Sequence, residues 1–333
     1  MKTTRLGTSG LEVSRLGLGC MSYGDPDWRP WILGEKEGRA HLSRALELGF
    51  NFFDTADMYS KGVSEQLTGK ILKDLADRED YVLATKCFFP LVDGPNRGGL
   101  SRKHIIAACD ASLSRLGHDY IDLYQIHRLD HQTPMEETLE ALDSLVRAGK
   151  VRYLGASSMA AWELAKMLFL ADAHGYHRFV SMQNHLNLAY REEEREMVPL
   201  CLDQGVGIIP WSPLARGFLA GNRRRAGKGD TRRAQGDPFA DDMYFRDEDW
   251  DVLDALVEVS RELGKTPAQV ALAWVLSVPG VDAPIVGTTK LEQMTELVEA
   301  VEIELDDALI ERLEAPYKPH PILGHHQRSP RSF

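Results

Sequence analysis

Short runs of apolar residues alternate with longer segments of helical period along most of this chain. Apolar runs of strand length occur at 16–19, 51–55, 81–86, 121–127, 151–156, 179–183, 207–211 and 283–286. Amphipathic segments lie between them, including 39–48, 64–76, 101–116, 134–148 and 162–174. Several of these begin near a serine and end before a glycine, as helices do. Strands that alternate with helices in this way predict βαβ units and a parallel sheet.

Eight strand–helix repeats favour a closed (β/α)₈ TIM barrel over an open doubly wound sheet. An open nucleotide-binding sheet usually carries a glycine fingerprint after its first strand, and the chain has neither G-x-G-x-x-G nor a Walker loop. Turn residues at 7–10 predict an N-terminal β-hairpin before the first barrel strand. We therefore expect residues 1–333 to form one barrel domain, with a long loop after strand seven and a C-terminal tail from about 316 to 333.

Composition narrows the classes of partner. The formal net charge of −11 argues against nucleic acid as a partner, because a polyanion is repelled by an acidic surface. The chain starts without a signal-peptide pattern and has no apolar run of 18 residues, so we expect a cytoplasmic protein with no membrane partner. A helix face in an oligomer interface has the same hydrophobic pattern as a helix face packed on the barrel. The sequence therefore leaves both a monomer and a dimer open.

Cysteine and histidine spacing predicts neither a disulfide framework nor a metal site. The four cysteines are widely scattered and are expected to be reduced thiols; they are Cys20, Cys87, Cys109 and Cys201. His127 and His131 stand four residues apart, but no third ligand follows at a suitable spacing. We expect no metal.

Four side chains with useful chemistry stand at the ends of successive predicted strands. Asp54 and Tyr59 follow strand two, Lys86 ends strand three and His127 ends strand four. In a barrel these positions converge on one face. A lysine beside a tyrosine favours the phenolate and lowers a phenol pKa of about 10, and Asp54 would orient the lysine. His127 would donate a hydrogen bond to a carbonyl, so this catalytic set fits carbonyl reduction by a nicotinamide.

The segment from 212 to about 246 is rich in glycine and carries seven arginine or lysine residues between 216 and 233 against one acid. One interpretation is a solvated surface insertion. The other is a basic lid that closes over a nucleotide phosphate, because the loops after strands seven and eight of this fold often build a phosphate site.

Several motifs carry a resemblance to a known family. They are NFFDTA at 51–56 with Tyr59, ATK at 84–86 and LYQIH at 123–127, followed by stretches at 155–158, 180–184, 211–217 and 283–289. Through them the chain resembles the aldo-keto reductases over nearly its whole length. The segment PYKPHP at 316–321 looks most like the bacterial branch, whose barrel is similar to that of potassium-channel β-subunits. The resemblance implies an NADP(H)-dependent oxidoreductase acting on aldehydes, ketones or alcohols, with Tyr59 as proton donor.

The resemblance also implies a cofactor site. Ser157 and Gln183 would bind the nicotinamide carboxamide and Trp211 would stack on its ring, although Trp211 can also be read as a barrel-rim packing residue and Gln183 as a satisfied polar group. Residues 212–217 would line the pyrophosphate, and Lys290 favours NADP(H) over NAD(H). The full expected set is Cys20, Met21, Asp54, Ser157, Ser158, Gln183, Trp211, Ser212, Pro213, Leu214, Ala215, Arg216, Gly217, Gly287, Thr289, Lys290, Gln293 and Glu296.

Two positions depart from the family pattern. Ser158 stands where relatives usually carry asparagine, and Leu297 stands where an asparagine often approaches the adenine. These departures put the affinity and the NADP/NAD preference in doubt, but not the type of cofactor.

The substrate pocket is expected to have an aromatic wall that suits aldehydes and quinone-like carbonyls. Its candidate residues are Met21, Tyr23, Trp28, Trp31, Phe88, Phe89 and Arg128. Two alternatives stay open. One is an NADP(H)-binding sensor subunit with little turnover, because channel β-subunits share the barrel. The other keeps the enzyme but binds a sugar phosphate through Arg128 or the basic 216–233 segment.

Overall fold

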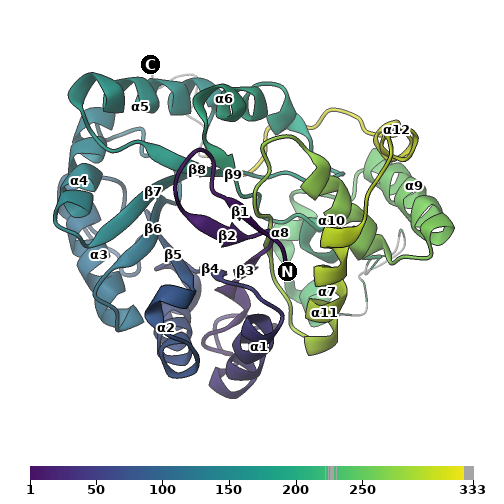
Figure 1. Cartoon of the computed structure of the whole chain (residues 1–333), viewed down its shortest axis with the longest axis horizontal. Helices are drawn as coiled ribbons and strands as arrows, with labels where there is room; N and C mark the ends of the chain where they lie inside the picture. The colour runs from purple at the N-terminus through teal and green to yellow at the C-terminus, as the bar shows by residue number, and fades with distance from the viewer. Residues whose placement is uncertain (222, 224, 226–228, 230, 326–333) are drawn as a thin grey trace.

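The computed structural model describes residues 1–221, 223, 225, 229 and 231–325. Eight parallel strands form one sheet in the order β10-β3-β4-β5-β6-β7-β8-β9 (Figure 1). The strands are β3 (Gly17–Gly19), β4 (Phe52–Asp54), β5 (Val82–Cys87), β6 (Ile121–Ile126), β7 (Val151–Ser157), β8 (Phe179–Gln183), β9 (Gly207–Ile208) and β10 (Ile285–Val286). Parallel bridges from Ile208 to Val281 and from Trp211 to Ile285 join the two ends of the sheet. The predicted (β/α)₈ barrel is confirmed.

The expected strands all occur, and several are shorter than expected; β9 and β10 keep only two residues each. β9 ends at Ile208 instead of 211, because Pro210 has no backbone N–H for the ladder. The carbonyl of Pro210 still accepts from Ile285 N at 2.8 Å, which is one of the contacts that closes the barrel.

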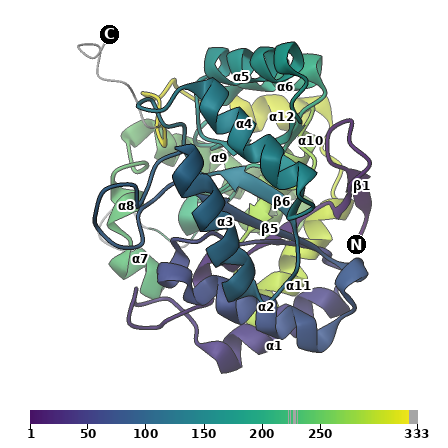
Figure 2. The ribbon, with the colours of Figure 1, turned by 90° about the vertical axis from the view of Figure 1, so that its left-hand side faces the viewer.

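Helices surround the barrel on its outside (Figures 1 and 2). They are α1 (Glu35–Glu47), α2 (Val63–Leu75), α3 (Arg102–Leu116), α4 (Met135–Arg147), α5 (Ala161–His174), α6 (Met197–Gln204), α9 (Asp247–Leu263), α10 (Pro267–Ser277), α11 (Leu291–Glu299) and α12 (Asp307–Glu314). Local chemistry sets their ends: Ser101 Oγ accepts from His104 N at the start of α3, and Gly117 ends it at φ 69°. None of the described helices is long and apolar enough to cross a membrane.

The N-terminal hairpin, β1 (Thr3–Arg5) and β2 (Glu12–Ser14), lies across one end of the barrel (Figure 1). Gly7 N donates to Asp282 Oδ2 at 2.7 Å, and Ser14 N donates to Asn51 Oδ1 at 2.6 Å, next to the start of β4. Its apolar side chains pack with those that fill the barrel; this cluster contains Leu6, Val13, Phe52, Val82, Ala84, Leu123, Ile209, Ala283 and Ile285. The hairpin therefore closes the amino-terminal end of the strands and leaves the carboxyl end for a site.

The sequence predicts a long loop after strand seven. In the structure, however, the segment from 212 to 246 is only partly irregular. It contains two short helices, α7 (Arg232–Gly236) and α8 (Pro238–Asp241). Thr231 Oγ1 caps α7 by accepting from Ala234 N at 3.1 Å, and a proline begins α8. Arg224 and Lys228 of the expected basic lid, and residues 326–333 of the expected tail, lie outside the described residues.

Candidate active site

A cavity of about 1050 Å³ opens at the carboxyl ends of the barrel strands. Asp54 ends β4, Tyr59 follows in the next loop, and His127 stands directly after β6; all three line the cavity. Lys86, near the end of β5, lies just beneath it and is fully buried. The barrel thus brings the four predicted catalytic residues together.

An ion pair between Asp54 and Lys86 forms the floor of this site. Lys86 Nζ donates to Asp54 Oδ2 at 2.5 Å and to the carbonyl of Thr55 at 2.8 Å, and the two side chains are only 0% and 3% exposed. The other carboxylate oxygen, Oδ1, accepts from Gln125 Nε2 at 2.9 Å and from Gln183 Nε2 at 3.0 Å. A buried carboxylate is tolerated only when it is paired and hydrogen-bonded in this way.

Gln125 was absent from the residues expected from the sequence. The available signal was its position in the run expected as a strand, 121–127, two residues before His127, because alternate residues of a strand face the same side.

Tyr59 and Lys86 perturb one another. Lys86 Nζ lies 5.1 Å from the centre of the Tyr59 ring. The expected lowering of the phenol pKa is not found: burial raises the pKa of Tyr59 above its usual value, and the charge of Lys86 opposes that rise without outweighing it. For Lys86, burial lowers the pKa, but Asp54 and Tyr59 outweigh it, so the net pKa is raised. At neutral pH the lysine is therefore charged and the phenol keeps its proton.

His127 stands edge-on to its neighbours. Its ring centre lies 5.9 Å from that of Tyr59 and 5.0 Å from that of Phe89, at angles of 84° and 83°. Burial, and then the charges of Lys86 and Arg128, lower the pKa of His127 well below its usual value. Its Nδ1 is buried without a hydrogen-bond partner among the described residues. The imidazole is therefore neutral, with one N–H to donate.

A flat aromatic surface borders the cavity beyond Gln183. The Trp211 ring lies parallel to that of His185, at 4.3 Å and 10°, and His185 lies parallel to Tyr190 at 4.1 Å and 13°. Trp211 Nε1 donates to Ser158 Oγ at 3.0 Å. Ser158 thus holds the indole from outside the cavity lining. This stack fixes the plane of Trp211, and His185 was not anticipated from the sequence.

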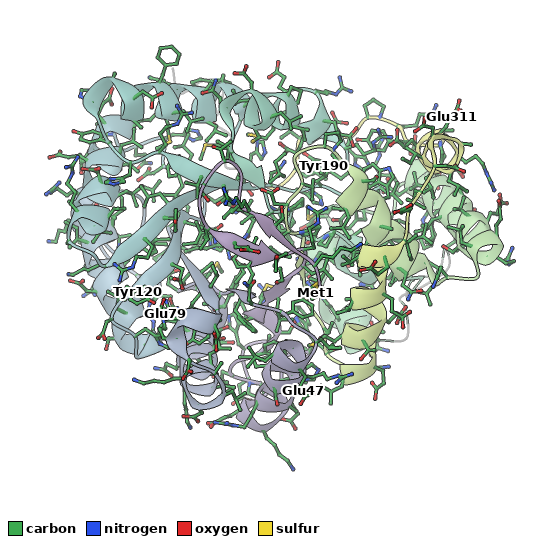
Figure 3. All side chains as sticks on the ribbon, in the orientation of Figure 1. Met1, Glu47, Glu79, Tyr120, Tyr190 and Glu311 are labelled. Atoms are coloured by element: carbon green, nitrogen blue, oxygen red, sulfur yellow. The ribbon has the colours of Figure 1, made fainter. Side chains whose placement is uncertain are left out.

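The tail supports the same stack from behind. Leu323 N donates to Tyr190 Oη at 3.1 Å, and the Tyr190 label in Figure 3 lies beside the yellow chain of the tail. His320 Nε2 lies 2.7 Å from Asp249 Oδ1, and both side chains are buried. Residues 316–325 are therefore packed against the barrel next to Trp211.

The loop after β9 has an unusual backbone. Ser212, Ala215 and Arg216 have φ values of 53°, 46° and 56°, a region that residues with a side chain rarely adopt. Turns of this kind direct backbone N–H groups to one side and form anion-binding concavities. Arg216 Nε also pairs with Asp237 Oδ2 at 2.6 Å, and Arg233 Nε reaches the same oxygen at 3.1 Å. The two helices of this segment are thereby joined to the loop.

The cavity continues to the start of α11. Its lining there includes Gly287, Thr289, Lys290, Gln293, Glu296 and Leu297. One cavity therefore contains, in order, an aromatic platform, two amide or hydroxyl groups, a loop with left-handed backbone, and a positively charged end at Lys290. That order fits a nicotinamide dinucleotide, and a volume of about 1050 Å³ leaves space for a second small molecule.

Most expected site residues line the cavity, and a few do not. Tyr23 is fully buried, and its hydroxyl donates to Thr288 O at 3.2 Å, so it is a core residue and not a pocket wall. Cys20 is also fully buried, which raises the pKa of its thiol to about 12. Ala215 is buried in the core, and Phe88 packs against Phe89 at 5.1 Å outside the lining.

The remaining expected pocket residues do line the cavity. They are Met21, Trp28, Trp31, Phe89 and Arg128. Other lining residues were not among the expected site residues, including Arg29, Met58 and Phe239; Arg233 also lines the cavity and belongs to the basic 216–233 segment. Among the described residues no three His, Cys, Asp or Glu side chains form a group that could hold a metal ion.

Comparison with known proteins gives a consistent result. The model of the aldo/keto reductase family matches residues 15–318. Versiconal hemiacetal acetate reductase of Aspergillus parasiticus is 45% identical, over 97% of this chain and 98% of its own. A candidate aryl-alcohol dehydrogenase of Schizosaccharomyces pombe is 42% identical over 96% of each chain. The aldo-keto reductase AMT2 of Alternaria alternata is 44% identical over 96% and 93%. These relatives are fungal, so they do not support the expected bacterial branch.

Proposed function

This chain belongs to the aldo/keto reductase family, and from that premise we propose that it is an NADP(H)-dependent oxidoreductase that interconverts a carbonyl compound and its alcohol. Tyr59 is the general acid/base. The observation that supports this best is the placement of a charged Lys86 beside Tyr59, with a neutral His127 at the ring edge, in one cavity.

Each residue of the set has a distinct task in carbonyl reduction. Tyr59 holds the proton that the carbonyl oxygen will receive, and the Lys86 ammonium stabilises the phenolate that remains. Asp54 keeps Lys86 charged and in place. His127 donates its N–H to the carbonyl oxygen and so orients it toward Tyr59. When bound, the nicotinamide supplies the hydride.

The hydrogen bonds around Asp54 also set the orientation of Gln183. The Gln183 amide has an NH₂ group that donates and a carbonyl oxygen that accepts. Only the NH₂ group can bond the carboxylate, so Nε2 faces Asp54 and Oε1 faces away from it. Oε1 is then an acceptor for the carboxamide of a nicotinamide that stacks on Trp211, with Ser157 beside it. Arg216 provides positive charge for the pyrophosphate, and Lys290 provides it for the 2′-phosphate, which supports NADP(H) over NAD(H).

An NADP(H)-binding sensor with little turnover is the main alternative. A sensor needs the cofactor pocket alone, whereas this chain also keeps the complete proton-transfer set beneath it. We therefore favour a cytoplasmic enzyme with a small-molecule substrate.

The test combines binding and turnover. Binding of NADPH to the purified protein is followed by quenching of tryptophan fluorescence, and 4-nitrobenzaldehyde is then added while nicotinamide absorbance is recorded. We expect quenching and turnover, and a loss of about 10²–10⁴-fold in kcat for Tyr59→Phe with NADPH binding retained. The matched control is Tyr120→Phe, because Tyr120 bonds Glu79 on the outside of the barrel (Figure 3). Quenching without turnover would favour the sensor, and neither signal would refute the cofactor assignment.

A further inference from the structure

The cavity concentrates positive charge in an otherwise acidic chain. Its lining includes Arg29, Arg128, Arg216, Arg233 and Lys290. The lining carboxylates are Asp54, which is occupied by Lys86 and two glutamines, and Glu296, which accepts from Thr266 Oγ1. Arg216 and Arg233 share one oxygen of Asp237. Two arginines are left without a carboxylate of their own in the described part of the chain.

Arg128 is the first of the two. It follows His127 directly, and its Nη1 donates to the carbonyl of His127 at 2.5 Å. Its guanidinium lies 5.9 Å from the centre of the Phe89 ring. Burial lowers the pKa of Arg128 to about 10, while the nearby Tyr59 phenol opposes that shift. A partly buried guanidinium without an anion carries a desolvation cost, so a ligand anion would be bound favourably here.

Arg29 is the second, on the loop after β3. Its guanidinium lies over two indoles, 4.6 Å from the centre of Trp28 and 5.4 Å from that of Trp31. Burial is the main cause that lowers the pKa of Arg29, and Arg216 adds to it. Asp237, and then the Tyr59 phenol, oppose that lowering of the pKa. Arg29 and Arg128 line the same cavity as Tyr59 and His127.

Resting on the proposed function, we propose that the preferred substrate is an aromatic aldehyde that carries a carboxylate, which binds Arg128 with Arg29 as a second cation. The ring packs against the aromatic wall of Trp28, Trp31 and Phe89. The carbonyl carbon gains the hydride and its oxygen gains the Tyr59 proton, so the product is the benzylic alcohol. The carboxylate is unchanged and serves only for binding.

The lining favours an aryl acid over a sugar phosphate. Indole and phenyl faces, together with Met21 and Met58, match a planar ring, whereas a sugar would leave hydroxyl groups against apolar surface. A guanidinium also matches the two oxygens of a carboxylate in a bidentate arrangement.

The primary test compares two substrates with the same ring and aldehyde. These are 4-carboxybenzaldehyde and its neutral methyl ester, methyl 4-formylbenzoate, each with NADPH at low ionic strength. We expect kcat/KM for the acid to exceed that for the ester by about tenfold or more, because a hydrogen bond to a charged group is stronger than one to a neutral group. The ratio should fall as salt is added.

Variants then assign the preference to residues. We expect Arg128→Met to bring the acid-to-ester ratio close to one, and Arg29→Met to lower it less. The ratio is internal to each variant, so partial loss of folded protein cancels. The matched control is Arg312→Met, because Arg312 pairs with Glu262 on the surface, away from the cavity lining, and should leave the ratio unchanged. A raised KM for NADPH in Arg29→Met with an unchanged ratio would assign Arg29 to the cofactor and overturn its part.

The outcomes separate this proposal from the proposed function. Turnover of the ester with an acid-to-ester ratio of one or below keeps the oxidoreductase and overturns the substrate class. A preference for glyceraldehyde 3-phosphate over glyceraldehyde, without a preference for the aryl acid, also overturns it in favour of a sugar phosphate. No turnover of any aldehyde would mean that the proposed function itself has failed.

Discussion

The Asp54–Lys86 pair can be tested by a double-mutant cycle on stability. In Asp54→Asn, Lys86 loses its counter-ion, so its charge is buried with neutral partners only. We expect a loss of about 3–5 kcal/mol in the free energy of unfolding. In Lys86→Met, Asp54 keeps two donors, Gln125 and Gln183, so we expect a loss near the lower end of that range.

The double variant Asp54→Asn/Lys86→Met removes both charges together. We expect it to lose about 2–3 kcal/mol less than the sum of the two single losses. The pKa of Lys86 is raised in the folded protein, so its stabilising contribution is complete below the unfolded value of 10.5 and is lost as pH rises through the higher folded value. At pH 7.5 the cycle therefore measures the whole interaction.

The assay is urea unfolding followed by far-UV circular dichroism, without cofactor, because a bound ligand would add its own stabilisation. Equal slopes across the four proteins show that the same surface is exposed on unfolding, so that midpoints can be compared. If the single losses add to the double loss within about 0.5 kcal/mol, the two charges do not interact. The explanation given for a charged lysine beside Tyr59 would then be refuted.

Two further predictions concern helix packing and acid stability. Gly69→Ala should strongly lower the free energy of unfolding, although alanine favours helices, because the new Cβ would lie 2.0 Å from the carbonyl oxygen of Leu116. The control Gly38→Ala should be tolerated, because the Cβ there would make ordinary contacts. Equal urea midpoints for the two variants would contradict this prediction. Burial lowers the pKa of His185 well below 6.5, so stability falls as pH drops below the unfolded value, by up to about 1.4 kcal/mol per pH unit. His185→Phe should reduce the difference in unfolding free energy between pH 7 and pH 5, and an unchanged difference would count against it.

The strands were predictable because each one is a short, continuous run of apolar residues that can be recognised without knowing its neighbours in the sheet. The run at 179–183 matches β8 at both ends, and the run at 121–127 matches β6 to within one residue. The short α7 was missed because it lies in a polar, glycine-rich segment, where only the capping residue Thr231 marks its start. Helices of this length have too few apolar positions to show a period.

The site was predictable to the extent that its residues stand at strand ends. Asp54, Lys86 and His127 converge because parallel strands of a barrel end on one face. The prediction that Tyr23 lines the substrate pocket was wrong, because a loop sequence does not show which way an aromatic side chain points. Its hydrogen-bond partner, Thr288, is 265 residues away in the chain. Gln125 was missed for a related reason, since its partner Asp54 belongs to a different strand.

The two oxygens of Asp54 link the side of the site proposed for proton transfer to the side proposed for the cofactor. Oδ2 binds Lys86, which lies beside Tyr59, and Oδ1 binds Gln183, which lines the cavity. A displacement of this carboxylate would therefore move both the ammonium beside the phenol and the amide proposed to hold the nicotinamide. Because Gln125 donates to the same Oδ1, it restrains both sides at once, so the distance between the proposed proton donor, Tyr59, and the proposed nicotinamide site is set by one buried network rather than by two independent sites.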